Sequence, residues 1–290
     1  RHTRYSLQSR GLGDVYKRQV SGYLVTKAIA GGVMLMAALM VLLGHADAQG
    51  AVGVMPPIVA AVFLGITSAL LIGDLKQPSR FYYLLTRSNT SSWLVKGAWV
   101  LGAFGAVTGL WVIGGVADAG GFLEVLAVPA AVLGAAVAGY TAFLFAQCEG
   151  RDLWQTPLLL PMLLARAVVA GAAAWAIADL FVDVPEPDAV LWALVGGAAA
   201  VMSLSWMETV SHGTRHVELA VHDLVKGDQA SLFWGGLAIG CAVPITLAVI
   251  ALATDSSSPA LGALAGAAAL IGMFLSEDAF IRAGQSVPLS

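Results

Sequence analysis

Charged residues are scarce in this chain of 290 residues. They make up 11% of it, whereas 58% is hydrophobic. Soluble domains carry roughly 25% charged residues, so this composition excludes an ordinary soluble fold and favours a bundle of membrane-spanning helices. The formal net charge of -3 gives no indication of a nucleic-acid partner.

Cysteine is almost absent, and histidine is absent from the middle of every long apolar run. Two cysteines, Cys148 and Cys241, cannot hold an iron–sulfur cluster, which needs about four thiolates. Their positions inside or at the end of apolar runs also argue against a disulfide framework. A haem b would need axial histidines within the helices, but the five histidines lie elsewhere: His2, His45, His212, His216 and His222. We therefore expect neither haem nor an iron–sulfur cluster of the chain's own.

The first 19 residues differ in composition from all that follows. They carry five of the fifteen Lys and Arg residues and no apolar core. A secretory signal would need a short apolar region and a cleavage site within about 30 residues, but the apolar run that begins near Val20 continues to Gly44. Two interpretations of residues 1–19 stay open, a disordered basic leader and a cloning or assembly artefact, and residues 20–290 form the membrane domain.

Eight apolar runs follow, each long enough to cross a hydrocarbon core about 30 Å thick. The predicted spans are residues 21–44, 53–73, 93–115, 123–147, 157–182, 188–209, 231–253 and 259–281. We therefore predict an all-α integral membrane protein of eight transmembrane helices, packed as two four-helix bundles. Strings of Gly and Ala within the spans suit close contact between helices.

The basic residues are distributed on one side of this arrangement. The predicted connections 45–52, 116–122, 183–187 and 254–258 contain no Lys or Arg. Beyond the second span, every Lys and Arg except Arg166, which lies inside a span, belongs to the other connections or to the tail. These residues are Lys76, Arg80, Arg87, Lys96, Arg151, Arg215, Lys226 and Arg282. By the positive-inside rule, both termini face the cytoplasm of a prokaryote whose plasma membrane holds the protein.

Residues 206–228 form the most histidine-rich of the basic segments. Glu208, His212 and His216 recur every four residues, which predicts that they share one face of one helix. Three interpretations stay open, namely a solvated helix end, contact with a quinone or a proton path, and metal binding. No third metal ligand is evident beside the two histidines, so no metal site is predicted.

Two segments on the basic side resemble the NrfD/polysulfide reductase membrane-subunit family. The first is an ordered string: Asp74-Leu75, Pro78, Arg80-Phe81, Leu84-Leu85-Thr86-Arg87, Asn89, Trp93 and Gly97-Ala98-Trp99. The second is Glu149-Gly150-Arg151-Asp152-Leu153-Trp154, with Pro157 beyond it. The chain departs from the family in having Lys76-Gln77 where Gly-Arg is frequent, and this leaves the polar contacts of that loop in doubt.

The resemblance covers the chain from about Val20 to Arg282, and it implies a function. Members of the family anchor an iron–sulfur, ferredoxin-like subunit, which is itself joined to a molybdopterin-type catalytic subunit. They exchange electrons with membrane quinone, either menaquinone or ubiquinone, and have no haem of their own. The chain is then a quinone-reacting or non-catalytic subunit of an oxidoreductase, with membrane lipid around it.

Quinone chemistry couples two electrons to two protons, so a site needs hydrogen-bond donors and a proton relay. Helix parity brings the start of the first span and three basic connections to one face. The candidate residues there are Tyr23, Lys27, Asp74, Arg80, Tyr82, Tyr140, Glu149, Arg151, Glu208 and His212. Each of them could instead form an interfacial salt bridge.

Arg166 is an ionisable residue deep inside a predicted span, where it needs a partner or water. We expect it to point into the bundle, towards a carboxylate or a quinone oxygen. Asp179, thirteen residues further on, lies roughly 20 Å away along the helix at 1.5 Å per residue. With Glu124 at a similar depth to Asp179, these residues form a candidate polar path to the far side. The alternative is that Arg166 is a structural tie and Asp179 an interfacial residue.

Two rival classes of function stay open. A secondary transporter would also have many spans, with its substrate site near the midplane. A purely structural anchor would present the same docking face without a quinone site. An adjacent gene for a subunit with four-cysteine clusters would favour the redox function.

Overall fold

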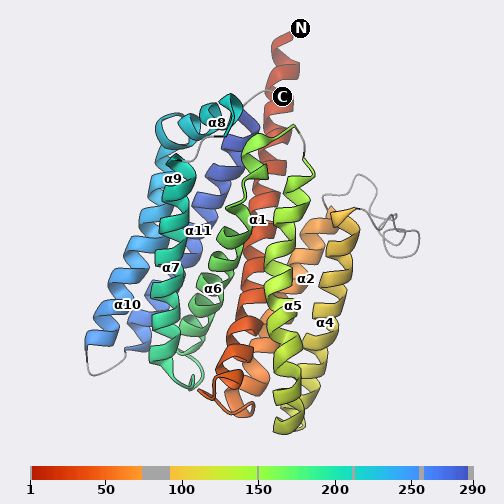
Figure 1. The fold of residues 1–290 in the computed structure, drawn as a ribbon, viewed down its shortest axis with the longest axis vertical. Coiled ribbons are helices and arrows are strands. Elements are labelled where there is room, and N and C mark those ends of the chain that lie inside the picture. The colour runs from red at the N-terminus through yellow and green to blue at the C-terminus, as the bar shows by residue number, and fades with distance from the viewer. Residues whose placement is uncertain (1, 74–91, 149, 211–212, 255–257, 287–290) are drawn as a thin grey trace.

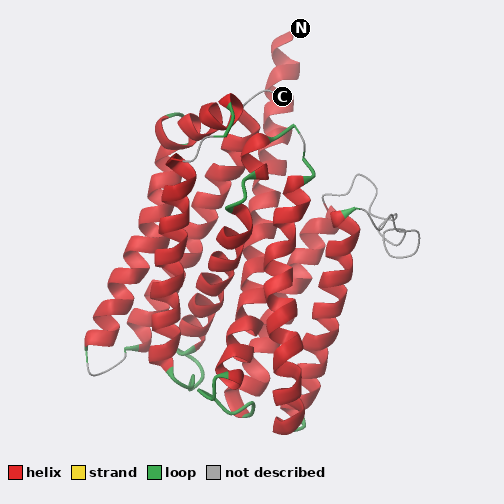
Figure 2. Cartoon of the chain, in the orientation of Figure 1, coloured by secondary structure: helices red, strands yellow, loops and turns green. Residues whose placement is uncertain are grey.

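The computed structural model describes residues 2–73, 92–148, 150–210, 213–254 and 258–286, and the side chains from residue 20 onwards. Every regular element in these ranges is helical (Figure 2). The elements are α1 (His2–Leu42), α2 (Gly50–Gly73), α4 (Trp93–Val116), α5 (Gly120–Ala146), the 3-10 turn η2 (Asp152–Gln155), α6 (Leu159–Ala178), α7 (Pro187–Val210), α8 (Arg215–Lys226), α9 (Ala230–Leu237), the π-turn η3 (Ala238–Ala242), α10 (Val243–Ala253) and α11 (Pro259–Ser286).

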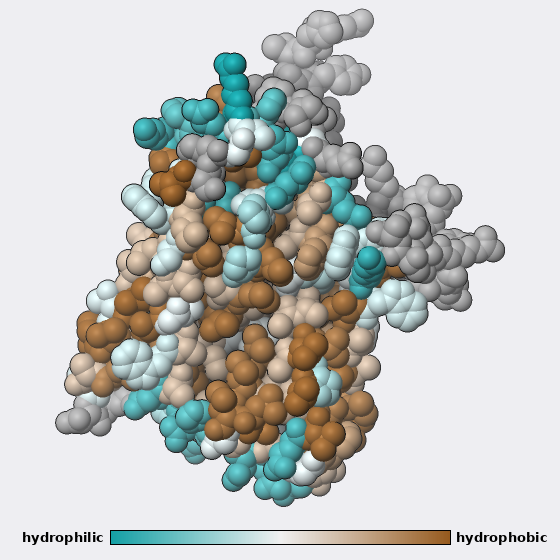
Figure 3. All heavy atoms as spheres, in the orientation of Figure 1, coloured by the Kyte–Doolittle hydropathy of each residue, from teal (hydrophilic) through white to brown (hydrophobic). Residues whose placement is uncertain are grey.

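Eight of the described helices are long and apolar enough to cross a membrane. Within a hydrocarbon layer the backbone must satisfy its own hydrogen bonds, so the apolar runs form helices. Six of the spans coincide with one element each; the span in α1 covers Val20–Leu42, and α9, η3 and α10 together form Ala230–Ala253. Figure 3 shows apolar side chains around the middle of the molecule and hydrophilic ones at both ends. The all-α membrane fold predicted from the sequence is confirmed.

The spans pack as two four-helix groups. α1, α2, α4 and α5 form one group, and α6, α7, α9–α10 and α11 form the other. α1 also packs against α6 and α11, so it joins the two groups (Figure 1). This central position explains why its span is the most buried of the eight.

The two groups meet where glycine lets two backbones approach. A Cβ added to Gly32 of α1 would collide with the carbonyl oxygen of Ala167 in α6, and one added to Gly171 would collide with the carbonyl of Gly32. Small residues at such crossings replace the hydrophobic driving force that is lacking between helices in lipid. The α1–α6 crossing therefore depends on glycine at both positions.

The seventh span, Ala230–Ala253, contains a π-turn shortly before a proline. Pro244 has no N–H with which to bond the carbonyl of Gly240, and its ring crowds that carbonyl. The helix widens over η3, which ends two residues before Pro244. In this turn, Gly240 packs directly on the backbone of Gly272 in α11.

Helix α1 begins at His2, so residues 2–19 have a helical backbone that continues into the first span. No proline interrupts residues 2–19, so nothing in their covalent structure stops the helix from extending. Both interpretations of residues 1–19, a basic leader and an artefactual segment, stay predictions.

Both termini lie at the same end of the bundle, as expected for an even number of spans (Figure 1). At this end the connections bear Arg151, Arg215 and Lys226, and we call it the basic end. The connections at the opposite end, residues 43–49, 117–119, 179–186 and 254–258, contain no Lys or Arg.

Candidate functional site

Buried polar side chains gather in the half of the bundle next to the basic end. Among the described residues, eleven polar or charged side chains are buried. Only Thr108 of these lies in the other half of its span. The remaining ten are Ser21, Lys27, Thr67, Thr141, Arg166, Ser205, Glu208, Ser276, Glu277 and Asp278. Ionisable groups inside spanning helices are costly and mark functional sites, so this half holds the candidate site.

The first component is a cluster of donors between α1 and α5. The hydroxyls of Tyr23 and Tyr140 are hydrogen-bonded to each other, and the Lys27 ammonium donates to the Thr141 hydroxyl. Lys27 Nζ lies 5.3 Å from the centre of the Tyr23 ring and 4.7 Å from that of Tyr140. Such cation–π contacts help to hold a cation that is only 1% exposed. We call these four residues the tyrosine–lysine cluster.

Helix α4 closes one side of this cluster through a glycine. A Cβ on Gly97 would collide with the ring of Tyr140. Gly97 belongs to the Gly97-Ala98-Trp99 string noted in the sequence, so the close approach gives that glycine a physical reason. The contact fixes the plane of the Tyr140 ring.

The second component is an ion pair between the two helices α6 and α11. Arg166 Nη1 lies 3.1 Å from Glu277 Oε1, and the two side chains are 6% and 1% exposed. Glu277 also attracts Lys27 of α1 electrostatically. The charge of Glu277 thus interacts with cations from two other helices, and one of these helices, α1, belongs to the other bundle. Arg166 is directed into the bundle towards a carboxylate.

A third group of contacts ties α1, α11 and the α5–α6 connection together near the basic end. Ser21 Oγ donates to Asp278 Oδ1 over 3.0 Å, and Arg282 Nε lies 2.7 Å from Asp278 Oδ2. From the connection, Arg151 Nη1 donates to the carbonyl of Gly284 over 3.1 Å. Arg151 therefore acts on the end of α11 in this structure and is not part of the tyrosine–lysine cluster.

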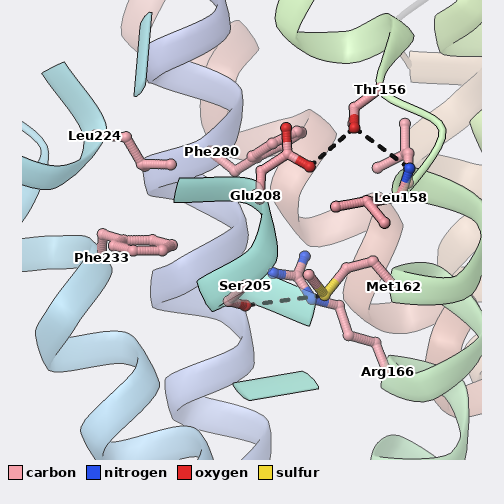
Figure 4. Close-up of a pocket in the computed structure, with 10 residues that line it drawn as sticks. Thr156, Leu158, Met162, Arg166, Ser205, Glu208, Leu224, Phe233 and Phe280 are labelled. Carbon is pink, nitrogen blue, oxygen red and sulfur yellow. Dashed lines mark hydrogen bonds between the residues drawn. The ribbon is translucent and has the colours of Figure 1, made fainter. Parts of the chain in front are cut away.

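A narrow pocket leads from the basic end to Arg166, and Figure 4 shows its lining. At its mouth, Thr156 Oγ1 donates to Glu208 Oε2 over 2.9 Å. Phe233 and Phe280 form apolar walls. The cavity volume of about 20 Å³ exceeds the roughly 10–15 Å³ that a water molecule requires. The pocket has polar groups at both ends and room for water, and it is far too small for a quinone ring.

A second, larger hollow is different in character. It measures about 370 Å³ and opens between α1, α6 and α7 towards the opposite end. Apart from His45 at its rim, its lining is apolar or aromatic, with Met36 and Trp192 among the larger side chains. Such an apolar lining suits contact with the hydrocarbon chains of lipid. The described residues that line this hollow include no cluster of groups that could carry protons.

The structure places the other predicted residues as follows. Asp74, Arg80, Tyr82, Glu149 and His212 lie outside the described residues.

Glu124 is exposed near the start of α5, and Asp179 caps α6, where its Oδ1 accepts a hydrogen bond from Val184 N over 3.4 Å. Between Arg166 and Asp179, α6 buries only apolar side chains such as Ala173 and Trp175. The polar path through Glu124, Arg166 and Asp179 stays a prediction, and the structure does not bring its three members into contact.

One prediction about the histidine-rich segment is wrong. Glu208, at the end of α7, and His216, in α8, do not share a helix, because α7 ends at Val210 and α8 begins at Arg215. Thr214 caps the new helix by accepting a hydrogen bond from Val217 N. Gly213 precedes this cap, and the Gly–Thr pair is a recognisable break. α8 then lies across the basic end of the second bundle instead of continuing α7 outwards (Figure 1).

The sequence reasoning missed Glu277 and Asp278. Both lie inside the last predicted span, and two adjacent carboxylates within an apolar run are themselves a signal that a polar interior exists. The polar neighbours Thr141 and Thr156 were also missed. Threonines of this kind carry no such signal, because isolated hydroxyls are common in spanning helices.

Cys148 offers a chemical test of the geometry at the basic end. Burial raises the pKa of the Cys148 thiol, and the nearby charge of Arg151 offsets part of that rise. A raised pKa means less thiolate at a given pH, and the thiolate is the nucleophile. We expect slow alkylation by iodoacetamide at neutral pH, faster alkylation as pH rises, and slower alkylation still in Arg151→Gln. Peptide mass spectrometry measures the rate against detergent-unfolded protein. Equal rates in folded and unfolded protein at neutral pH would contradict the predicted burial.

Comparison with known proteins identifies the family of this membrane fold. The family described as Polysulphide reductase, NrfD matches residues 17–288. The protein is also similar to the C subunit of polysulfide reductase from Wolinella succinogenes, with 28% identity over 218 residues, which cover 66% of this sequence and 69% of that protein. With its eight apolar helices, this chain is a multi-pass membrane protein that belongs to the polysulphide reductase NrfD family.

Proposed function

We propose that this chain is the membrane subunit of a reductase complex, and that it exchanges electrons between membrane quinone and an iron–sulfur partner subunit. The family and the name of its relative support a place in a reductase. The observation that carries the quinone assignment is the tyrosine–lysine cluster, a set of buried donors in the half of the bundle next to the basic end.

The donor set suits a quinone head group. A quinone carbonyl only accepts hydrogen bonds, and the phenols of Tyr23 and Tyr140, with the Lys27 ammonium, can donate them. When bound, the quinone supplies two-electron, two-proton redox chemistry. The protein's own part is to orient a carbonyl oxygen, to stabilise negative charge on it, and to exclude water.

The partners follow from the family resemblance. A ferredoxin-like iron–sulfur subunit docks at the basic end, where the donor cluster is nearest the surface, and a molybdopterin-type subunit lies beyond it. We place this end on the cytoplasmic side of a prokaryotic plasma membrane, because the opposite connections lack Lys and Arg. The scarcity of cysteine and the positions of the histidines support a chain without haem or cluster.

The cluster can be tested by comparing two lysines. Lys27→Met removes a buried cation, whereas Lys96→Met removes an exposed one that lies 4.6 Å from the centre of the Trp93 ring. We expect Lys27→Met to weaken binding of a quinone analogue about tenfold or more, since a hydrogen bond from a charged group contributes about 1.5–3 kcal/mol. Binding is measured on the intact complex by equilibrium titration.

The control Lys96→Met should bind the analogue like the parent. Two outcomes would defeat the assignment. If the parent complex binds no analogue, the chain is a structural anchor. If both lysine variants bind it equally well, the quinone lies elsewhere.

A further inference from the structure

The proposed quinone chemistry needs protons, and the structure contains a set of groups that extends from the basic end to Lys27. Glu208 stands at the mouth of the pocket in Figure 4, and Arg166 lines its inner part. Arg166 pairs with Glu277, and Glu277 attracts Lys27. Lys27 in turn belongs to the tyrosine–lysine cluster.

The Glu277 carboxylate is poorly satisfied for a buried group. Both of its oxygens lack a hydrogen bond of good geometry, although Arg166 is 3.1 Å away. Around it, Asp278 and Arg282 of the same helix pair with each other, and Cys241 of η3 lies near Arg166. A buried carboxylate of this kind responds to the charge on its neighbours, since opposite charges favour ionisation and desolvation opposes it.

The buried polar side chains extend towards the basic end only. Ten of the eleven buried polar side chains described lie in the half next to the basic end. Beyond Arg166, α6 buries Ala172, Ala173 and Trp175, and the indole of Trp175 is held by a hydrogen bond to the carbonyl of Val33. Alanine methyl groups, and an indole whose N–H is already bonded to a backbone carbonyl, give a proton no carrier along this part of α6.

We propose that Glu208, Arg166, Glu277 and Lys27 form a one-sided proton relay, which connects the solution at the basic end with the tyrosine–lysine cluster and is closed to the opposite end. This inference rests on the proposed quinone function. It adds the proton donor, the side of the membrane from which protons come, and a working connection between the two bundles.

The proton transfers balance as follows for quinone reduction. The Lys27 ammonium gives one proton to the oxygen held at the tyrosine–lysine cluster and becomes a neutral amine. The Glu277 carboxylic acid restores that proton, and Arg166 stabilises the carboxylate that is left. Arg166 keeps its own proton throughout. Glu208 takes a proton from solution and gives it to water in the pocket. That water passes the proton on to Glu277, which pairs with the Arg166 guanidinium at the pocket wall.

Two such rounds deliver two protons, while the two electrons come from the iron–sulfur partner. Quinol oxidation uses the same steps in reverse. Since Glu277 alternates between two protonation states, it should show a titrating carboxyl signal even without turnover.

The experiment uses the intact complex with three variants. Arg166→Gln/Glu277→Gln replaces the ion pair by two neutral amides, so neither member of the pair is left charged without the other. Glu208→Gln blocks the entrance, and Glu218→Gln is the matched control, because Glu218 is an exposed carboxylate of α8 at the same end of the bundle. Each variant is measured for quinone-analogue binding, quinone-linked turnover, and carboxyl protonation by infrared difference spectroscopy.

We expect all three variants to bind the analogue like the parent. Turnover should fall about a hundredfold in the double variant, as for loss of a proton-transfer group, and it should fall in Glu208→Gln but not in Glu218→Gln. The infrared signal of a titrating buried carboxyl should vanish in the double variant. In proteoliposomes, protons should be taken up at the basic end.

Two results would overturn the relay, namely parental turnover with an unchanged infrared signal in the double variant, or proton uptake from the opposite end. If the double variant does not assemble, the turnover of Glu208→Gln tests the relay instead. Parental turnover in Glu208→Gln would contradict proton entry through Glu208 and so overturn the relay. A parent complex that binds no quinone analogue would instead refute the proposed function.

Discussion

Glu277→Ala is expected to destabilise the folded protein by about 3–5 kcal/mol, because it leaves the Arg166 guanidinium buried without its partner. The side chain of Arg166 is only 6% exposed, so it cannot regain its hydration without opening the contact between α6 and α11. The measurement is the free energy of unfolding in mixed detergent micelles. Glu124→Ala, which removes an exposed carboxylate, should change it by less than about 0.5 kcal/mol.

A double variant separates charge from packing. Arg166→Met/Glu277→Leu replaces both ions with apolar side chains, and such replacements are often neutral or stabilising by about 1–4 kcal/mol. We therefore expect it to recover most of the stability that Glu277→Ala loses. Recovery of stability without recovery of turnover would show that the ion pair is kept for function. A Glu277→Ala variant as stable as the parent would contradict the buried ion pair between Arg166 and Glu277.

Gly32→Leu is expected to disrupt the contact between the two bundles. Any Cβ at this position meets the carbonyl oxygen of Ala167, and backbone cannot move aside as a flexible side chain can. Overpacking of a close contact costs about 1–3 kcal/mol and occasionally more, and we expect the upper part of that range. The yield of monodisperse protein after detergent extraction, together with the free energy of unfolding, measures the effect.

Gly196→Leu is the matched control. Gly196 also lies inside a spanning helix, but it is exposed and a Cβ there meets nothing within 4 Å. We expect parental yield and a change in stability within about 0.5 kcal/mol. Equal losses in both variants would mean that leucine itself is harmful in these helices, and that the α1–α6 crossing has no special need for glycine.

Much of the architecture was determined by the sequence alone. Apolar runs of spanning length have only one regular solution in a hydrocarbon layer, which is the helix, so the number and approximate limits of the spans could be predicted. The distribution of Lys and Arg likewise predicted that one end differs from the other. The motif strings around Asp74 and Glu149 predicted the family that comparison then showed, although both of these residues lie outside the described parts of the structure.

Within the site, the sequence indicated single residues but not their partners. Tyr23, Lys27, Tyr140, Arg166 and Glu208 were all predicted to matter, because a polar group within an apolar run requires an explanation.

The sequence did not show that Arg166 would pair with Glu277, more than one hundred residues away. That pairing depends on how α6 and α11 rotate about their axes, and nearly uniform apolar helices carry little periodic signal to reveal it. The four-residue spacing from Glu208 to His216 likewise predicted one continuous helix, and the Thr214 cap broke it.

Local sequence determined that helices form, because hydrogen bonding inside lipid is a local requirement. Only the tertiary structure decided which faces meet, because close packing between Gly32, Ala167 and Gly171 is a property of several segments at once. The same packing lets the charge of Lys27 in one bundle act on Glu277 in the other. The side-chain partners that a proton relay requires thus arise from contacts that no single stretch of the sequence contains.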